Sequence, residues 1–124
     1  MRKFILMLTI IVSLYGCNHV ENQTITLDEI FLQPEKSYHV LFFLDSCMAC
    51  RNIKLTIKNK KIKVYYIDLF NCSCLDSNES DNEGINVPND IKINSAPTLL
   101  LIEEKKVKKQ INGYRDCRYY LLYY

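Results

Sequence analysis

The hydrophobic and polar positions after residue 36 predict alternating strands and helices. Residues 38–44 form a nearly continuous apolar run, rich in aromatic and branched side chains, which is typical of a strand covered on both faces. Residues 50–60 then place Ile53 and Ile57 four positions apart, as on one face of a helix. Residues 62–69, rich in branched and aromatic side chains, predict a second strand. This strand, helix, strand order favours parallel pairing within an α/β domain, with residues 38–44 as the central strand.

The segments on either side predict shorter elements. Residues 24–32 begin with an alternating pattern and predict a strand or turn leading into a brief helix, with Thr26 or Asp28 as its cap. In residues 87–93, Pro88 stands near the first position of a second short helix. Residues 98–102 and 107–111 flank a short polar connection and predict a β-hairpin. After Gly113, the Tyr and Leu residues of segment 114–124 predict a closing helix that packs on the sheet.

The length and charge of the chain exclude several classes of protein. The chain has 124 residues, enough for one globular domain. It has 16 Lys and Arg residues against 14 Asp and Glu residues, and the two extra positive charges are Arg2 and Lys3. Because the rest of the chain is balanced, we expect no nucleic-acid partner.

The N-terminal segment predicts a compartment. Residues 4–14 form an uncharged apolar run that is too short to span a bilayer comfortably and has the proportions of a secretion signal. The run ends in Leu14-Tyr15-Gly16-Cys17, which resembles the lipobox of bacterial lipoproteins, where the cysteine is diacylated and becomes the mature N-terminus. We therefore expect a lipid on Cys17 and a position outside the cytoplasm, anchored to the cell membrane. The predicted parts are a signal peptide at 1–16, a lipid-anchored tether at 17–23 and a domain at 24–124 with an acidic loop insertion at 71–86.

A second interpretation of the N-terminus stays open. The chain could be an ordinary secreted or uncleaved protein in which Cys17 is a plain thiol. Under either interpretation the domain works outside the cytoplasm, where disulfides persist.

Three motifs and the order of the predicted elements resemble the thioredoxin superfamily. The motifs are Cys47-Met48-Ala49-Cys50 between a strand and a helix, the segment Ser95-Ala96-Pro97-Thr98-Leu99-Leu100 before the hairpin, and Gly113 after it. The resemblance covers residues 24–124. It implies an α/β, thioredoxin-like fold, a central mixed sheet flanked by helices, and thiol-disulfide oxidoreductase activity with no cofactor. It also implies a cis Ala96-Pro97 bond that offers main-chain hydrogen bonds to a substrate peptide.

The chemistry of thiols fits this resemblance. The unpaired N–H groups and the dipole at a helix N-terminus favour the thiolate form of a cysteine, and the thiolate is the species that attacks a disulfide. Asp45 and Ser46 are good helix caps, which places both cysteines in the first turn. Cys47, the more exposed position, is therefore the predicted nucleophile. Cys50 would attack the mixed disulfide and release the product.

The lipobox-like N-terminus and three departures from the thioredoxin pattern refine the expected type of oxidoreductase. The small size and lipobox suggest the extracytoplasmic thioredoxin-like lipoproteins of Gram-positive bacteria, including those that accompany bacteriocin export. The partners would be thiols or disulfides of exported proteins or peptides, and a membrane redox partner. Ser46 stands where the family often has Trp, and Leu41 where many reducing members have a buried carboxylate. Met48-Ala49 matches neither the Gly-Pro of strong reductants nor the Pro-His of strong oxidants, so the redox direction stays open.

Other functions compete for the same residues. The Cys47 and Cys50 pair could form an inert disulfide in a non-catalytic module that binds a peptide at Ala96-Pro97. Four thiolates, from Cys47, Cys50, Cys72 and Cys74, could hold a metal, although zinc sites prefer two Cys-x-x-Cys pairs. We expect no metal, and we expect neither His19 nor His39 to be a ligand.

Cys72, Cys74 and Cys117 remain after these assignments. Either Cys72 or Cys74 could bridge to Cys117 and join the acidic loop to the last helix, which would be a structural disulfide. The alternative is that the extra cysteines form a second redox relay.

Overall fold

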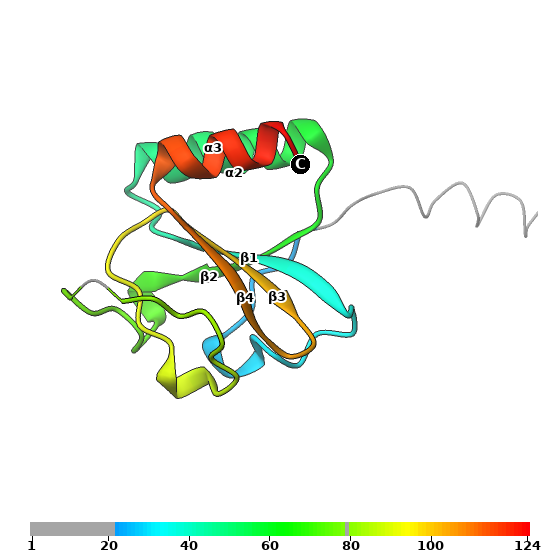
Figure 1. Ribbon diagram of the computed structural model, residues 1–124. Helices are drawn as coiled ribbons and strands as arrows, with labels where there is room; N and C mark the ends of the chain where they lie inside the picture. The colour runs from blue at the N-terminus through cyan, green and yellow to red at the C-terminus, as the bar shows by residue number, and fades with distance from the viewer. Residues whose placement is uncertain (1–21, 79) are drawn as a thin grey trace, which may run out of the picture.

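A four-stranded mixed sheet forms the centre of the domain in the computed structural model, which describes residues 22–78 and 80–124 (Figure 1). The strands lie in the order β2-β1-β3-β4, with β1 parallel to β2 and antiparallel to β3, and β3 antiparallel to β4. Tyr38 to Phe43 are all buried, which confirms β1 as the central strand. The predicted parallel pair and hairpin are also confirmed. The strand bounds are Ser37–Phe43 for β1, Val64–Asp68 for β2, Thr98–Glu103 for β3 and Lys106–Asn112 for β4.

Two α-helices lie side by side on one face of the sheet (Figure 1). They are α2, Met48–Lys60, and α3, Tyr114–Leu122, close to the segments where the sequence predicts them. Ile53 and Ile57 of α2 and Leu121 of α3 are fully buried and pack with Leu41 of β1 and Leu99 of β3. This is the apolar stripe expected of a helix that covers a sheet.

The other face is covered by irregular chain and three short 3-10 helices. These are η1, Leu27–Glu29, η2, Leu69–Asn71, and η3, Pro88–Asp90. Thr26 is the N-cap of η1, one of the two caps that the sequence predicted. Its backbone N–H and its hydroxyl both donate to Glu29 Oε1. Pro88 occupies the start of η3, as predicted. A second apolar cluster fills this face, and its fully buried members include Ile30, Phe42, Ile91, Leu100 and Ile102.

The topology places several element ends at one edge of the sheet. Phe42, near the end of β1, pairs with Thr98 at the start of β3, and Thr98 pairs with Asn112 at the end of β4. Because β1 leads into α2 and β4 into α3, both helices begin at this edge. Gly113 joins β4 to α3 with φ 84°, a conformation that favours glycine. β2 also ends here, since Phe43 pairs with Asp68 in parallel. We call this edge the site edge.

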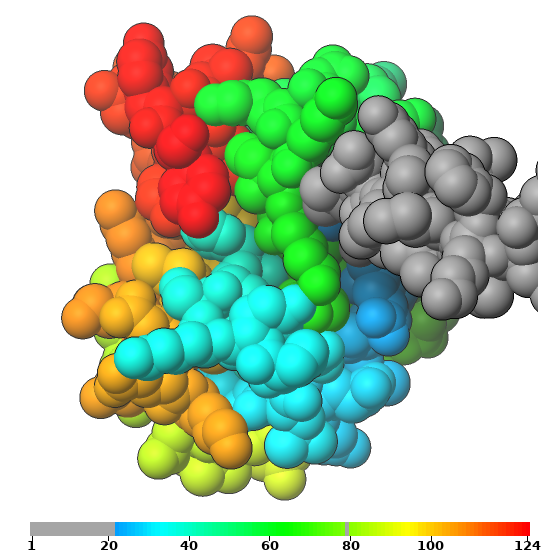
Figure 2. All heavy atoms as spheres, turned by 90° about the vertical axis from the view of Figure 1, so that its right-hand side faces the viewer, coloured from blue at the N-terminus to red at the C-terminus, as the bar shows by residue number. Residues whose placement is uncertain are grey.

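The opposite end of the molecule faces the viewer in Figure 2. There the C-terminal ends of α2 and α3, coloured green and red, meet, and Lys60 Nζ donates to the carbonyl oxygens of Leu121 and Leu122, at 2.8 Å each. The predicted signal peptide at 1–16, the lipidated Cys17 and most of the tether lie outside the described residues, as does His19. Within residues 22–78 and 80–124, no helix is long and apolar enough to cross a membrane.

Candidate active site

Cys47 caps the N-terminus of α2 at the site edge. Its backbone is extended, with φ −87° and ψ 111°, and its Sγ accepts a hydrogen bond from the backbone N–H of Cys50 at 3.1 Å. The sequence predicted a cap at Asp45 or Ser46, which is wrong because the helical hydrogen bonds begin one residue later, with Arg51 N–H donating to the Cys47 carbonyl. The sulfur thus occupies the place that a capping oxygen usually takes, where N–H groups stabilise negative charge.

Cys50 lies one turn into α2, behind Cys47. Only 1% of Cys50 is exposed, whereas Cys47 is partly exposed. Burial and the adjacent Cys47 raise the pKa of Cys50 to about 11. The structure therefore separates an outer sulfur that a partner can reach from an inner thiol that holds its proton firmly. The difference in exposure agrees with the sequence prediction, and the roles of the two cysteines stay a prediction.

Lys54 lies one further turn along α2 and contributes a positive charge. Its Nζ is 3.3 Å from the ring centre of Phe43 and 5.0 Å from that of Tyr66. Burial lowers the pKa of Lys54, while the charges of Asp45, Cys50 and Asp68 act in the opposite direction. The interaction is mutual, and the Lys54 ammonium favours the thiolate of Cys50. Lys54 was not among the residues predicted from the sequence, although its position four residues after Cys50 on a helix was a usable signal.

The loop before β3 brings its backbone to the two cysteines. The Ala96-Pro97 bond is cis, as the resemblance implied, and the Ala96 carbonyl oxygen is 3.9 Å from Cys47 Sγ. The buried Thr98 hydroxyl donates to the Ser95 carbonyl at 2.8 Å, and Gly113 N–H donates to the Pro97 carbonyl at 2.9 Å. These bonds fix the loop to the sheet and to the start of α3.

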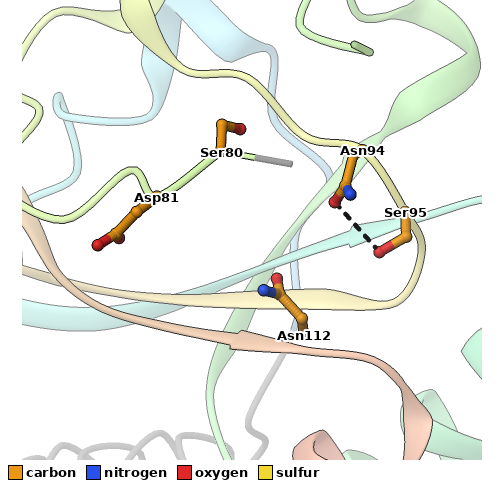
Figure 3. A pocket seen from close by; sticks show the side chains of 5 residues that line it. All are labelled: Ser80, Asp81, Asn94, Ser95 and Asn112. Atoms are coloured by element: carbon orange, nitrogen blue, oxygen red, sulfur yellow. Dashed lines mark hydrogen bonds between the residues drawn. The ribbon is translucent and has the colours of Figure 1, made fainter. Parts of the chain in front are cut away.

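A polar pocket of about 380 Å³ adjoins this loop (Figure 3). It lies beside Ser95, the residue before Ala96, and Figure 3 shows side chains from the loop, the acidic segment and the end of β4 around it. No signal in the sequence brought these segments together, because their contact depends on how the segment between β2 and β3 folds back. The lining residues are Ser80, Asp81, Asn94, Ser95 and Asn112.

The remaining cysteines pair differently from the prediction. Cys72 and Cys74 form a disulfide with each other, and Cys117 is a buried thiol with no disulfide partner among the described residues. The predicted bridge from either residue to Cys117 is wrong because the sheet lies between them. Cys117 packs in the helix-side cluster, and Cys74 in the cluster on the other face. The Cys117 sulfur instead lies 3.4 Å from the Ile111 carbonyl oxygen, and burial raises the pKa of Cys117 to about 12.

His39 and two of the four cysteines of the metal alternative have other partners in the structure. His39 is buried in β1, with Nε2 2.8 Å from the Tyr120 hydroxyl, and burial lowers its pKa to about 4. His39 is therefore a buried residue of β1 whose ring has a hydrogen-bond partner in Tyr120. In the described part of the chain no three His, Cys, Asp or Glu residues gather as metal ligands. Cys72 and Cys74 are bonded to each other, so their sulfurs are not available as thiolate ligands in a four-cysteine metal site.

The mixed sheet, the Cys-x-x-Cys at a helix start and the cis proline beside it define a thioredoxin-like α/β fold. A thioredoxin mutant from Halobacterium salinarum superposes with a TM-score of 0.58 at 14% identity, over 85% of this chain and 88% of that one. A thioredoxin from Malassezia sympodialis superposes with a TM-score of 0.56 at 14% identity, over 83% of this chain and 90% of that one. The long form of thioredoxin f from spinach chloroplast superposes with a TM-score of 0.53 at 15% identity, over 85% of this chain and 83% of that one. No protein-family model and no curated protein matches this chain.

Proposed function

We propose that the protein is a thiol-disulfide oxidoreductase whose working pair is Cys47 and Cys50. One observation carries the proposal: the partly exposed Cys47 sulfur accepts the Cys50 N–H at 3.1 Å and has the buried Cys50 thiol behind it. The Cys47 sulfur lies at the helix N-terminus with a backbone N–H directed at it, and the residue is partly exposed, so a disulfide of a partner can approach it. The fold that the chain shares with the thioredoxins supports the same conclusion.

The reaction follows from this division of roles. The Cys47 thiolate attacks one sulfur of a substrate disulfide, a Cys47-substrate bond forms, and the other substrate sulfur leaves and takes up a proton. Cys50 then loses its proton and attacks Cys47 Sγ, which releases the second substrate thiol. The substrate gains two electrons and two protons, and the Cys47 and Cys50 dithiol loses them. In the reverse direction the oxidised pair donates its disulfide.

The loop before β3 supports a peptide as the substrate. An extended peptide lying along Ser95 and Ala96 would place its sulfur near Cys47 and a neighbouring side chain over the polar pocket. Asp81 and two asparagines in this pocket favour a polar or cationic side chain. We propose exported proteins or peptides as substrates, supported by the signal-like N-terminus and by the presence of a disulfide elsewhere in the domain.

The same proposal places the protein at the membrane. A lipid on Cys17 would hold the domain, through residues 17–23, on the outer side of the cell membrane, where a membrane redox partner could renew the pair. The lipobox-like sequence, the small size and the fold together support a lipoprotein-type oxidoreductase of Gram-positive bacteria. More specifically, the protein could act as an accessory oxidoreductase of a bacteriocin export system.

The test is the reduction potential of the Cys47 and Cys50 pair in the full-length protein. The protein is equilibrated with reduced and oxidised glutathione and alkylated, and the mass shift is read for peptides that carry these two residues. A reversible midpoint is expected. A value of about −120 mV identifies a disulfide donor, and a value of about −270 mV identifies a reductant. A pair that never exchanges with glutathione would contradict the proposal and favour an inert binding module.

A trapping experiment tests the roles of the two cysteines. The Cys50→Ser variant should accumulate a mixed disulfide between Cys47 and a substrate, because the resolving thiol is missing. The matched Cys47→Ser variant should accumulate much less, since Cys50 is buried. Equal trapping by both variants would contradict the assignment of Cys47 as the nucleophile.

A further inference from the structure

We propose that the Cys72–Cys74 disulfide is a second thiol-disulfide exchange site, which opens and closes with a dithiol of another molecule. This inference is independent of the activity proposed for Cys47 and Cys50. It begins from a bridge that links residues only two positions apart.

The bridge contributes little to holding the fold together. A disulfide stabilises a protein chiefly by closing a loop in the unfolded chain, and the effect grows with the length of that loop. A loop between Cys72 and Cys74 is about as short as a loop can be, and the bridge connects no second element to the acidic segment. The segment is instead held by main-chain bonds that involve its neighbours, with Ile93 N–H donating to the Cys74 carbonyl and Asp76 N–H to the Ile93 carbonyl, both at 2.9 Å. Stability therefore does not explain why the two cysteines are bonded.

The surroundings of the two sulfurs repeat the arrangement at Cys47 and Cys50. Cys72 is partly exposed and Cys74 is 1% exposed, just as Cys47 is partly exposed and Cys50 is 1% exposed. The backbone N–H of the inner residue points to the outer sulfur in both pairs, from Cys74 to Cys72 Sγ at 3.2 Å and from Cys50 to Cys47 Sγ at 3.1 Å. A thiolate released at Cys72 would therefore keep a hydrogen-bond donor.

The surface around the bridge offers contacts to a protein partner. Phe70 and Leu75, which flank the two cysteines, are 86% and 56% exposed. These two side chains are apolar surface that a partner approaching Cys72 would contact. The bridge follows the end of β2 and Cys47 follows the end of β1, so both exchange sites belong to the site edge.

The chemistry balances with one dithiol. A thiolate of the partner attacks Cys72 Sγ, the Cys72–Cys74 bond breaks, and Cys74 leaves with the electron pair and takes up a proton. The partner's second thiol then attacks the mixed disulfide, so that the partner's own disulfide forms and Cys72 leaves as a thiolate that is protonated. The partner loses two electrons and two protons, which Cys72 and Cys74 gain. The reverse sequence closes the bridge and reduces the partner.

The experiment uses the full-length Cys47→Ser/Cys50→Ser variant, and the readout is taken on the proteolytic peptide that carries Cys72 and Cys74, so that Cys17 and Cys117 do not contribute. Glutathione serves as the probe, with two molecules in place of the dithiol, and alkylation after acid quenching counts the open thiols on that peptide by mass. We expect a reversible change between the closed and the doubly alkylated form while the far-ultraviolet circular dichroism stays constant. A bridge that stays closed at every glutathione ratio, or opens only as the circular dichroism is lost, would overturn the proposal.

Two further variants test the roles of the sulfurs and the structural alternative. In the same background, Cys74→Ser should bind one glutathione at Cys72 at least tenfold faster than Cys72→Ser binds one at Cys74; equal rates would overturn the proposal. The Cys72→Ser/Cys74→Ser variant with Cys47 and Cys50 intact should keep its fold. If that variant unfolds, the bridge is a structural disulfide that the fold requires, and the proposal is wrong. The same variant measures exchange at Cys47 and Cys50 alone, so failures of the two proposals can be told apart.

Discussion

The ammonium of Lys54 lies 3.3 Å from the ring centre of Phe43, one helical turn beyond Cys50. This contact holds a positive charge against an aromatic face, where an ammonium is well tolerated. Many reducing members of the thioredoxin superfamily have a buried carboxylate, which assists the inner thiol, at the position that Leu41 occupies in this chain. Leu41 is fully buried among apolar side chains and supplies no charge. The charge that favours the thiolate of Cys50 from within α2 is therefore that of Lys54.

The first prediction is that Lys54→Met slows the resolving step. Removing the ammonium should raise the pKa of Cys50 further, so less thiolate is present at a given pH and the pH profile of the step moves upward. The measurement is the rate at which a mixed disulfide on Cys47 is resolved, followed by single-turnover kinetics between pH 7 and pH 10.

Two matched variants make this result specific. Lys54→Arg keeps the charge and the contact with the rings, so it should retain most of the rate. Lys58→Met removes an exposed charge one turn further along the same helix and should leave the profile unchanged. If Lys54→Met and Lys58→Met behave alike, Lys54 has no role in resolving the disulfide.

The elements that the sequence predicted well are those with a strong local pattern. The apolar run of β1, the spacing of Ile53 and Ile57 and the two hairpin strands each determine a local structure that burial then reinforces. The site edge was also predictable, because a Cys-x-x-Cys between a strand and a helix fixes where both sulfurs lie. The cis Ala96-Pro97 bond came from resemblance and not from any local rule.

The pairing of Cys72 with Cys74 and the polar pocket could not be predicted in this way. Whether Cys74 or Cys72 can reach Cys117 depends on which face of the sheet each segment covers, and the segment between β2 and β3 has no periodic pattern that shows its face. The pocket depends on the same segment, because Ser80 and Asp81 reach Asn112 only after the chain folds back. The local sequence pattern predicts regular helices and strands, but it does not predict where an irregular segment lies in the folded domain.

The second prediction concerns the loop that carries Ala96. Thr98 is fully buried, and its hydroxyl donates to the Ser95 carbonyl at 2.8 Å. Thr98→Val keeps the shape but leaves that carbonyl without its partner, so we expect a loss of about 1–3 kcal/mol in the free energy of unfolding. Urea denaturation measures it. Exchange at Cys47 should also fall several-fold, because the neighbouring backbone is less well fixed.

A threonine on α2 provides the control for this prediction. The Thr56 hydroxyl donates to the Asn52 carbonyl within the helix at 3.1 Å, a bond that contributes little to stability. Thr56→Val should therefore change the free energy of unfolding by less than about 0.5 kcal/mol. Equal losses in the two variants would show that the Thr98 hydroxyl has no special part in holding the loop.

The third prediction tests the proposed anchor. Cys17→Ser removes the sulfur that a lipid would modify, so the protein should move from the membrane fraction to the soluble fraction and lose the label from a radioactive fatty acid. The matched control is Cys117→Ser, which changes a buried cysteine in the domain and should leave the label in place. If Cys17→Ser keeps both the label and the membrane association, the lipoprotein proposal is wrong.

The fourth prediction is a loss of stability between pH 6.5 and pH 4 that depends on His39. Burial lowers the pKa of His39 in the folded protein to about 4, from an ordinary value near 6.5. Below pH 6.5 the unfolded chain binds a proton that the folded protein does not bind, so stability falls as the pH falls and the loss is complete near pH 4. The expected loss is about 3 kcal/mol.

His39→Phe removes the titrating ring and fills a similar volume, at the cost of the hydrogen bond to the Tyr120 hydroxyl. The variant should be less stable at pH 7, yet its free energy of unfolding should change much less between pH 6.5 and pH 4. Carboxylates titrate around the lower end of this window, and their contribution is common to both proteins and cancels in the comparison. Urea denaturation at half-unit intervals of pH measures the two slopes. Parallel slopes would mean that His39 takes up a proton in the folded protein as readily as in the unfolded chain, which its burial against Tyr120 and Tyr124 should prevent.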